Sequence, residues 1–189
     1  MKVYANAFAA GRAAPGAVVA VGKFDGLHRG HAALLRLAAR RAAALGALLL
    51  VATFDPSPEA FFDRDAHAPI QTRAQLLAGL ESLGADAALF LPFTRRLVCQ
   101  APRAFARDVL GRALKAAEVC VGSDFCFGED RAGRVPHLRE FGREYGFAVR
   151  AAPLVRVGGR KVSSSEIRRL LAAGRRREAE RLLGRALPS

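Results

Sequence analysis

The segment from Gly22 to His31, GKFDGLHRGH, is the feature that most restricts the fold of this chain. Its first residues complete a short, β-branched apolar run at residues 17–24. Its last residue begins residues 31–44, where Ala and Leu recur at helical spacing. This order predicts a strand, a glycine turn and a helix. The first N–H groups of a helix lack partners within it and lie at the positive end of its dipole, so they attract phosphate. We therefore expect a phosphate-binding site here.

Three glycines and two histidines suit such a site. Gly22, Gly26 and Gly30 would let the backbone turn tightly and approach a triphosphate without a Cβ in the way. His28 and His31 are three residues apart, so they would share a helix face and could donate hydrogen bonds to one group. Two alternatives stay open. One is zinc binding, for which no third His or Cys lies close in sequence, and the other is capping of the helix, which Ser, Thr, Asp and Asn perform more often.

Length and composition limit the protein class. The 189 residues fit one domain, large enough to bury about 70% of its unfolded surface, and we expect no second domain. No apolar stretch of about 18 residues occurs and residues 1–16 lack the long apolar core of a signal peptide, so we expect a cytoplasmic protein without a membrane segment. Cys99, Cys120 and Cys126 show no CxxC spacing. We expect them to be reduced and mostly buried, without a disulfide framework or zinc ribbon.

The net charge of +13 comes chiefly from arginine, because all but four of the 30 basic residues are Arg. Such a charge suits polyanionic partners, including nucleotides and nucleic acids. The basic excess is greatest in residues 150–189. An Arg- and Ala-rich composition also follows from a GC-rich genome, and we assign most of the arginines to solvated faces. Few aromatic residues accompany them, so we expect small-molecule partners rather than nucleic acid. The oligomeric state is left open.

Strand and helix patterns alternate along the chain. Further apolar runs occur at residues 47–54, 86–93, 117–122 and 147–155, and helical patterns occur at 73–83, 104–114 and 138–145. This predicts an α/β fold with about five parallel strands, helices on both faces and ligands at the carboxyl ends of the strands. Residues 56–71 and 128–136 are predicted as long loops, which are often functional.

A second phosphate-binding pattern lies near the carboxyl end, in VSSSEIRRLLAAG at residues 162–174. The three serines, residues 163–165, can cap a helix whose apolar side carries Ile167, Leu170 and Leu171. Capping needs only one serine. With Arg168 one turn into the helix and Lys161 just before it, the serines also form a plausible clamp for phosphate oxygens.

Four motifs together resemble a known family. GKFDGLHRGH, TFDPSPEAFF (residues 53–62), VGSDFCFGEDRAG (121–133) and VSSSEIR (162–168) match, in order and separation, the FMN adenylyltransferase module of bacterial bifunctional riboflavin kinase/FAD synthetases. AERLLGRALP (179–188) resembles the end of that module. The resemblance implies a Rossmann-like nucleotidyltransferase fold over residues 1–189, with ATP and FMN as substrates and Mg²⁺ as cofactor. Because the sequence stops at residue 189, we expect no riboflavin kinase domain.

The resemblance also implies roles for individual residues. It places His28 and His31 on the ATP phosphates and Asp124 near the reacting phosphates. The residues implied to shape the nucleotide pocket or hold the triphosphate are Gly22, Phe24, Asp25, Gly30, Ser164, Ser165 and Arg168. The residues implied to line the flavin pocket are Pro56, Pro58, Phe62 and Phe127. The two phenylalanines suit stacking on an isoalloxazine ring and suit an ordinary core equally well.

The implied reaction is in-line attack by an FMN phosphate oxygen on the α-phosphorus of ATP, which gives FAD and pyrophosphate without a covalent intermediate. The sequence departs from the family pattern at Ser57, where His is frequent, at Cys126, where Arg is common, and at Ser165, where Thr is usual. Two alternatives stay open. One is nucleotidyl transfer with another nucleotide, such as CTP, or another phosphate-bearing acceptor. The other is a non-catalytic nucleic-acid-binding or regulatory relative.

Overall fold

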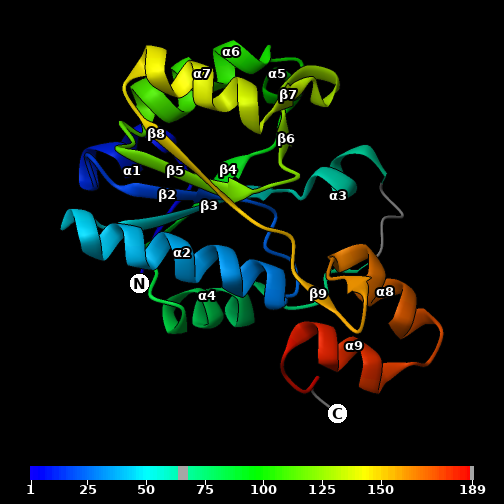
Figure 1. Cartoon of the computed structure of the whole chain (residues 1–189). Coiled ribbons are helices and arrows are strands. Elements are labelled where there is room, and N and C mark those ends of the chain that lie inside the picture. Colours follow the sequence, from blue (N-terminus) through cyan, green and yellow to red (C-terminus); the bar gives the residue numbers. More distant parts are fainter. Residues whose placement is uncertain (64–67, 188–189) are drawn as a thin grey trace.

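A computed structural model describes residues 1–63 and 68–187. Its centre is a six-stranded sheet in the order β1-β4-β3-β2-β5-β8, in which all neighbouring strands are parallel (Figure 1). The strands are β1 Lys2–Tyr4, β2 Val18–Val21, β3 Leu49–Asp55, β4 Ala87–Pro92, β5 Glu118–Gly122 and β8 Ala148–Ala152. The middle strands are buried along almost their whole length, as expected for a parallel sheet covered on both faces.

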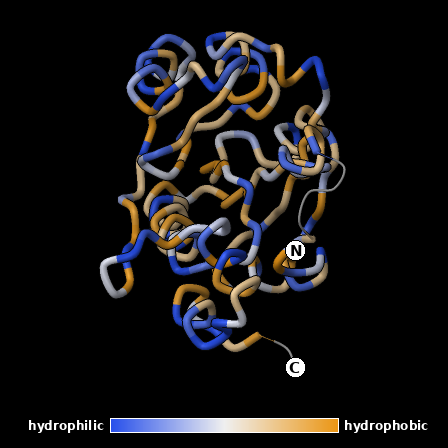
Figure 2. Tube along the Cα trace, turned by 90° about the vertical axis from the view of Figure 1, so that its right-hand side faces the viewer, coloured by the Kyte–Doolittle hydropathy of each residue, from blue (hydrophilic) through white to orange (hydrophobic). Residues whose placement is uncertain are grey.

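Helices cover the two faces of this sheet. α2 (Arg29–Leu45) and α4 (Arg73–Ser82) pack on one face through Leu35 and Leu80. On the other face lie α1 (Ala7–Ala13), α6 (Pro102–Phe105), the π-helical segment Ala106–Ala113 and α7 (Val135–Tyr145). Hydrophobic and hydrophilic segments alternate along the trace (Figure 2), and α2 and α7 each bury one side, as amphipathic helices on a sheet do.

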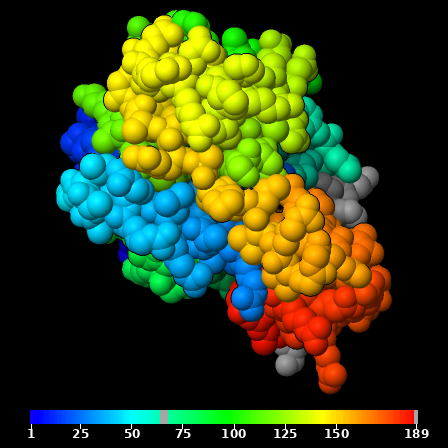
Figure 3. Space-filling view, in the orientation of Figure 1, coloured from blue at the N-terminus to red at the C-terminus, as the bar shows by residue number. Residues whose placement is uncertain are grey.

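The chain after the sheet forms a C-terminal unit with an apolar core of its own. It contains the hairpin of β9 (Arg156–Val157) and β10 (Arg160–Lys161), followed by α8 (Ser164–Ala172) and α9 (Arg176–Leu183). Its buried residues are Val162, Ile167, Leu170, Ala179, Leu182 and Leu183. In the space-filling view this unit forms a lobe beside the start of α2 (Figure 3).

The structure confirms the predicted α/β architecture and all five predicted strands, and it corrects the strand count. The sixth strand, β1, is an edge strand of three residues. The predicted loop at residues 56–71 contains the short helix α3 (Pro58–Phe62), and residues 64–67 of that loop lie outside the described residues. The predicted loop at 128–136 contains the 3₁₀ turn Glu129–Arg131, the strand β7 (Gly133–Arg134), which pairs with β6 (Cys126–Phe127), and the start of α7.

The chain also contains another short helix and three cysteines. α5 (Arg95–Val98) follows β4. The cysteines are free, but the expectation that they are mostly buried is wrong: Cys120 is buried, Cys126 is partly exposed and Cys99 is exposed. Within residues 1–63 and 68–187, no helix is long and apolar enough to cross a lipid bilayer.

Candidate active site

The sheet topology predicts where a ligand binds. From β2 the chain passes through α2 to β3, which is the neighbour of β2 in one direction along the sheet. β5 is the neighbour of β2 in the other direction. The crevice at the carboxyl ends of two strands where the winding direction reverses is the usual ligand site of such folds. The turn at residues 22–28 follows β2 and Asp124 follows β5, so both predicted segments meet at this switch point.

His28 and His31 lie together at the start of α2. His28 is the N-cap residue, and its Nδ1 accepts a hydrogen bond of 3.2 Å from the backbone N–H of His31. Helix capping, one of the alternatives for the sequence, is therefore a real role of His28. Because Nδ1 is the acceptor, the proton of the neutral ring sits on Nε2. The two rings stack, and the fully buried Phe24 ring packs against His31 in an edge-type contact with 5.3 Å between centroids.

Both imidazoles are neutral near pH 7. Burial lowers the pKa of His28 to about 4, although a hydrogen bond within the residue and the charge of Asp124 act in the opposite direction. Burial, together with the nearby His28 and Lys23, holds the pKa of His31 well below its usual value. The pair therefore offers neutral hydrogen-bond donors, and an added phosphate would favour protonation of either ring.

The glycines of the turn serve two different purposes. Gly26 has a left-handed φ of 87°, as a tight turn requires. Gly22 and Gly30 do not have left-handed φ values. Instead, a Cβ on Gly30 would lie 3.1 Å from Cε1 of His28, and a Cβ on Gly22 would lie 3.1 Å from Cζ of Phe24. These two glycines make room for the rings that form the site, which sequence spacing alone did not indicate.

Asp25 joins the turn to two distant segments. Its carboxylate accepts a hydrogen bond of 2.9 Å from the N–H of Ile70 and forms an ion pair with Arg168 of α8. Ser164 Oγ donates a 2.8 Å hydrogen bond to the carbonyl of Asp25. Burial raises the pKa of Asp25, although Arg168 and the Ile70 bond act to lower it. Asp25 therefore helps to hold the turn in place, because its side chain and its carbonyl both bind residues outside the turn.

Two buried polar atoms at this site lack a hydrogen-bond partner among the described residues: Nδ1 of His31 and Nε of Arg168. Buried polar groups are nearly always paired, so atoms of this kind indicate a polar ligand or a water molecule. Both belong to residues that the sequence assigned to the ATP phosphates. The predicted cluster from the first and the fourth motif is therefore assembled in space.

Charged pairs border the crevice on both sides. Lys161 Nζ lies 2.6 Å from Oδ2 of Asp124, which places β10 against the loop after β5. Lys23 forms an ion pair with Glu59 of α3 and so links the histidine turn to the segment that carries Pro56, Pro58 and Phe62. Both pairs are half-exposed, so an incoming anion can reach the two lysines.

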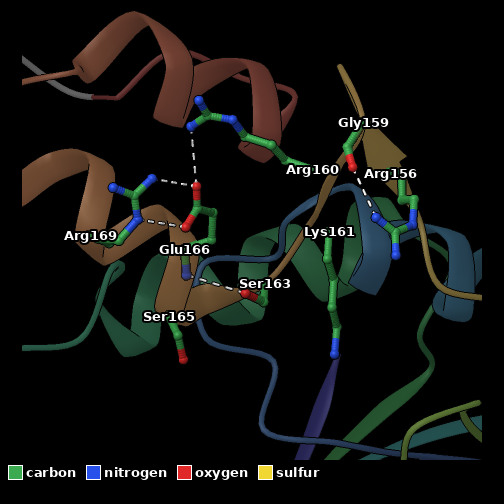
Figure 4. A pocket seen from close by; sticks show the side chains of 8 residues that line it. All are labelled: Arg156, Gly159, Arg160, Lys161, Ser163, Ser165, Glu166 and Arg169. Atoms are coloured by element: carbon green, nitrogen blue, oxygen red, sulfur yellow. Dashed lines mark hydrogen bonds and ion pairs between the residues drawn. The ribbon is translucent and has the colours of Figure 1, made fainter.

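The three serines act differently from one another. Ser163 is the N-cap of α8 and its Oγ accepts from the N–H of Glu166 at 3.2 Å. Ser164 binds the turn, as described above. Ser165 lines an open cavity of about 530 Å³ between the β9–β10 hairpin and α8 (Figure 4). The other residues around this cavity are Arg156, Gly159, Arg160, Lys161, Ser163, Glu166 and Arg169.

The predicted flavin-side residues separate into two groups. Phe62 is 69% exposed on α3 and belongs to an aromatic cluster with Phe61 and Phe93 at the carboxyl end of β4. Pro56 follows a cis peptide bond and Pro58 is the first residue of α3, which Ser57 caps. Phe127, in contrast, is buried in the core beneath α6 and α7, with its ring stacked on Phe125.

The residues present suit one kind of metal site. Within the described parts of the chain, no three His, Cys, Asp or Glu side chains are grouped to hold a metal ion. Mg²⁺ commonly needs no such group, because it keeps several waters and binds one or two carboxylates together with substrate phosphates. Asp124 is a half-exposed carboxylate at the switch point and suits that role.

Comparison with known proteins identifies the family. The family model described as FAD synthetase matches residues 11–166, which is most of the chain. The chain belongs to the FAD synthetase family. Its sequence is 39% identical to the bifunctional riboflavin kinase/FMN adenylyltransferase of Pseudomonas fluorescens over 170 residues, covering 90% of this chain and 55% of that protein. It is 37% identical to a putative protein of the same name from Geobacillus thermodenitrificans, covering 93% of each.

The chain spans about half the length of the Pseudomonas fluorescens relative and of most other curated relatives that it matches. Among solved structures, one titled macrolide-efflux protein from Streptococcus pneumoniae has a TM-score of 0.86 and 28% identity, covering 99% of this chain and 60% of that one. Pantoate-beta-alanine ligase from Francisella tularensis has a TM-score of 0.59 and 15% identity, covering 88% of this chain and 72% of that one. This second likeness concerns the fold alone.

Proposed function

We propose that this chain is an FMN adenylyltransferase, which transfers AMP from ATP to the phosphate of FMN and releases FAD and pyrophosphate. The observation that carries the proposal is the stacked, neutral pair of His28 and His31 at the start of α2, located at the switch point of an FAD synthetase fold. A pair of fixed donors at a helix N-terminus suits the oxygens of a reacting triphosphate.

The reaction needs little acid–base chemistry from the protein. The phosphate of FMN is already ionised at pH 7, so its oxygen can attack the α-phosphorus of ATP directly, and the α–β bridging oxygen leaves with pyrophosphate. Catalysis then depends on alignment and on stabilising charge that develops on the phosphates. His28 and His31 donate hydrogen bonds to these oxygens. Arg168 and the N-terminus of α8 add positive potential from the opposite side.

Each remaining nucleotide-side residue has a defined part in this proposal. Ser165 and Lys161 reach the distal phosphates from the β9–β10 side, and Gly22, Phe24, Asp25, Gly30 and Ser164 keep the turn in shape. Asp124 would hold Mg²⁺ together with the nucleotide phosphates. When bound, the ion neutralises charge on those phosphates.

The flavin acceptor binds, in this proposal, on the aromatic side of the crevice. The exposed face of Phe62 is free to stack on an isoalloxazine ring, with Pro56 and Pro58 shaping the loop that carries it. Phe127 is buried, so we assign it to the core that supports this wall and not to direct contact. The ion pair between Lys23 and Glu59 connects the flavin side to the nucleotide side.

The substrates proposed are small molecules, ATP with Mg²⁺ and FMN, and the site of action proposed is the cytoplasm, where both are present. We do not expect riboflavin kinase activity from residues 1–189, because the family match covers the FAD synthetase region.

A substrate-exchange assay tests the proposal. Purified protein with Mg²⁺ is given ATP or CTP, each with FMN or with riboflavin, and products are separated by chromatography. We expect FAD only from ATP with FMN. A dinucleotide product from CTP would replace the proposed nucleotide. If FMN gives no product, the assay is repeated with other phosphate monoesters, and a reaction with one of them would replace the proposed acceptor. Binding of the protein to RNA without any nucleotidyl transfer would support the regulatory alternative.

A further inference from the structure

The backbone of the histidine turn is held by side chains from four other parts of the chain. Four successive carbonyls, those of residues 23–26, each accept a hydrogen bond from a different side chain. The donors are Thr53 Oγ1 to Lys23 (3.0 Å), Gln71 Nε2 to Phe24 (3.0 Å), Ser164 Oγ to Asp25 (2.8 Å) and Arg185 Nη2 to Gly26 (3.3 Å). The conformation of this turn is therefore imposed from outside its own sequence.

The turn needs such support because its backbone is unfavourable. Phe24 has a φ of 49° and Leu27 a φ of 41°, in the left-handed region that residues with a Cβ rarely adopt. Residues in this conformation persist where the surrounding structure fixes them. The next residue is His28, so relaxation of the turn would move the imidazole pair.

Gln71 is, with Thr53, one of the two buried members of this set. It is 8% exposed and lies just before α4, whose N-cap is Thr72. Its Nε2 donates to Phe24, and its Oε1 accepts a hydrogen bond of 3.2 Å from Nη2 of Arg185. Both ends of the amide are thus paired, as a buried amide requires. Arg185 consequently acts on the turn twice, once directly at Gly26 and once through Gln71.

Arg185 is brought to the turn by the end of α9. Gly184 caps α9 in the left-handed conformation, with a φ of 80°, and a Cβ there would lie 3.1 Å from Cγ of Arg29. Arg29, the first residue of α2, donates through Nε to the carbonyl of Arg181 at 2.8 Å. The C-terminal unit is therefore attached directly to the helix start that carries the histidines.

We propose that Gln71 and Arg185 form a brace that positions His28 and His31, and that both are positioning residues for nucleotidyl transfer. The brace joins the segment before α4 and the segment after α9 to the same turn. The effect of the brace on turnover rests on the proposed function. Its effect on the position of the two histidines is independent of that function.

The test is a double-mutant cycle with Gln71→Met, Arg185→Met and the double variant. The matched control is Arg177→Gln, which changes an exposed arginine on α9 outside the brace. For each protein, kcat and KM for ATP are measured with FMN, thermal unfolding is recorded, and the titration of His28 is followed by NMR. A displaced histidine loses alignment with the phosphates, so we expect each single variant to lower kcat by about tenfold. The double variant should be no slower than the slower single variant, because the two residues act as a unit.

The titration supplies a readout that needs no activity. His28 should titrate closer to 6.5 in Gln71→Met and Arg185→Met than in the wild type, because a loosened turn exposes the ring to water. The control should match the wild type in every measurement. If kcat and the His28 titration stay unchanged while only the melting temperature falls, the two residues are merely structural and the proposal is wrong. Additive losses in the double variant would also overturn the brace. If the wild type makes no FAD, the proposed function fails, and the titration still decides whether the brace exists.

Discussion

His28 and His31 face each other as stacked imidazoles, with ring centroids 3.6 Å apart and planes inclined by 12°. Burial is the main cause of the lowered pKa of each ring, and the neighbouring His28 lowers the pKa of His31 further. The stack leaves the Nε2–H of His28 as a donor, because Nδ1 is used in capping α2. The pair combines a structural role in the helix with a proposed role in the chemistry.

Replacing His28 separates these two roles. His28→Asn keeps a side-chain acceptor at the N-cap, for which Asn is among the preferred residues, but removes the Nε2 donor. We expect it to fold with near wild-type stability and to lose about a hundredfold in kcat, as when one preorganised donor is removed. His28→Ala should lose the same activity and, in addition, about 1 kcal/mol of stability. Steady-state kinetics and urea unfolding check both. Turnover by His28→Asn near the wild-type rate would remove His28 from the mechanism.

The lowered pKa of His28 predicts how stability depends on pH. The unfolded chain binds this proton at a pKa of about 6.5, and the folded chain at about 4. The contribution of His28 to the free energy of unfolding is therefore complete above pH 6.5 and is lost as the pH drops toward 4, because the unfolded state takes up the proton first. A shift of this size corresponds to roughly 3 kcal/mol as an upper figure. The measurement is the free energy of unfolding at pH 7, 6 and 5, compared between wild type and His28→Asn.

Only the difference between the two proteins counts in that experiment, because carboxylates such as Asp25 and Glu118 also titrate at acidic pH. We expect the wild type to lose more stability than His28→Asn between pH 7 and pH 5. Parallel curves would show that His28 is not held neutral by the fold.

Gly30→Ala tests the packing of the stack. An added Cβ would lie 3.1 Å from Cε1 and 3.2 Å from Nδ1 of His28, so the ring must shift by a few tenths of an ångström. Alanine favours the helix over glycine, so the stability should be maintained. We expect kcat to fall by about tenfold from misalignment alone. A variant with both normal stability and normal turnover would show that the ring position is not critical.

Glu118 provides a test of stability without activity. This carboxylate is 2% exposed at the amino end of β5, and it accepts hydrogen bonds of 2.8 and 3.0 Å from Arg41, with Arg150 at 3.4 Å. Burial alone would raise the pKa of Glu118. The hydrogen bonds and charge of Arg41, and to a smaller extent those of Arg150, outweigh this effect, so the pKa is lowered. Glu118→Gln should lower the free energy of unfolding by about 1–3 kcal/mol. The loss should lie toward the lower end of this range because both arginines reach solvent.

Turnover by Glu118→Gln should equal that of the wild type, because the strand separates Glu118 from the crevice by about 13 Å at roughly 3.3 Å per residue. Thermal unfolding and FAD formation measure the two effects separately. A loss of kcat without a loss of stability would contradict this assignment.

Local patterns in the sequence explain which parts of the fold could be predicted. β2, β3, β4 and β5 are mainly apolar runs and α2 has a clear helical repeat, so pattern and structure agree. Arg150 interrupts β8, but the apolar residues around it still indicated a strand. β1 has only three residues and no buried one, so it lacks a hydrophobic signal. α3 contains five residues between prolines and aspartates, a composition that also describes a loop.

The candidate site was predictable where its residues are close in sequence. His28 and His31 are three residues apart, and the serines precede a helix. Gln71 and Arg185 gave no such signal, because they meet the turn across 47 and 159 residues of sequence. The burial of Phe127 depends on packing beneath α6 and α7, which the motif VGSDFCFGEDRAG does not reveal.

The most direct test of the account is the stoichiometry of FAD and pyrophosphate formed from ATP, Mg²⁺ and FMN by the wild type and by His28→Asn. We expect the wild type to release one pyrophosphate for each FAD, and folded His28→Asn to form both about a hundredfold more slowly. Pyrophosphate release without FAD, or equal rates for the two proteins, would contradict adenylyl transfer to FMN at the histidine pair.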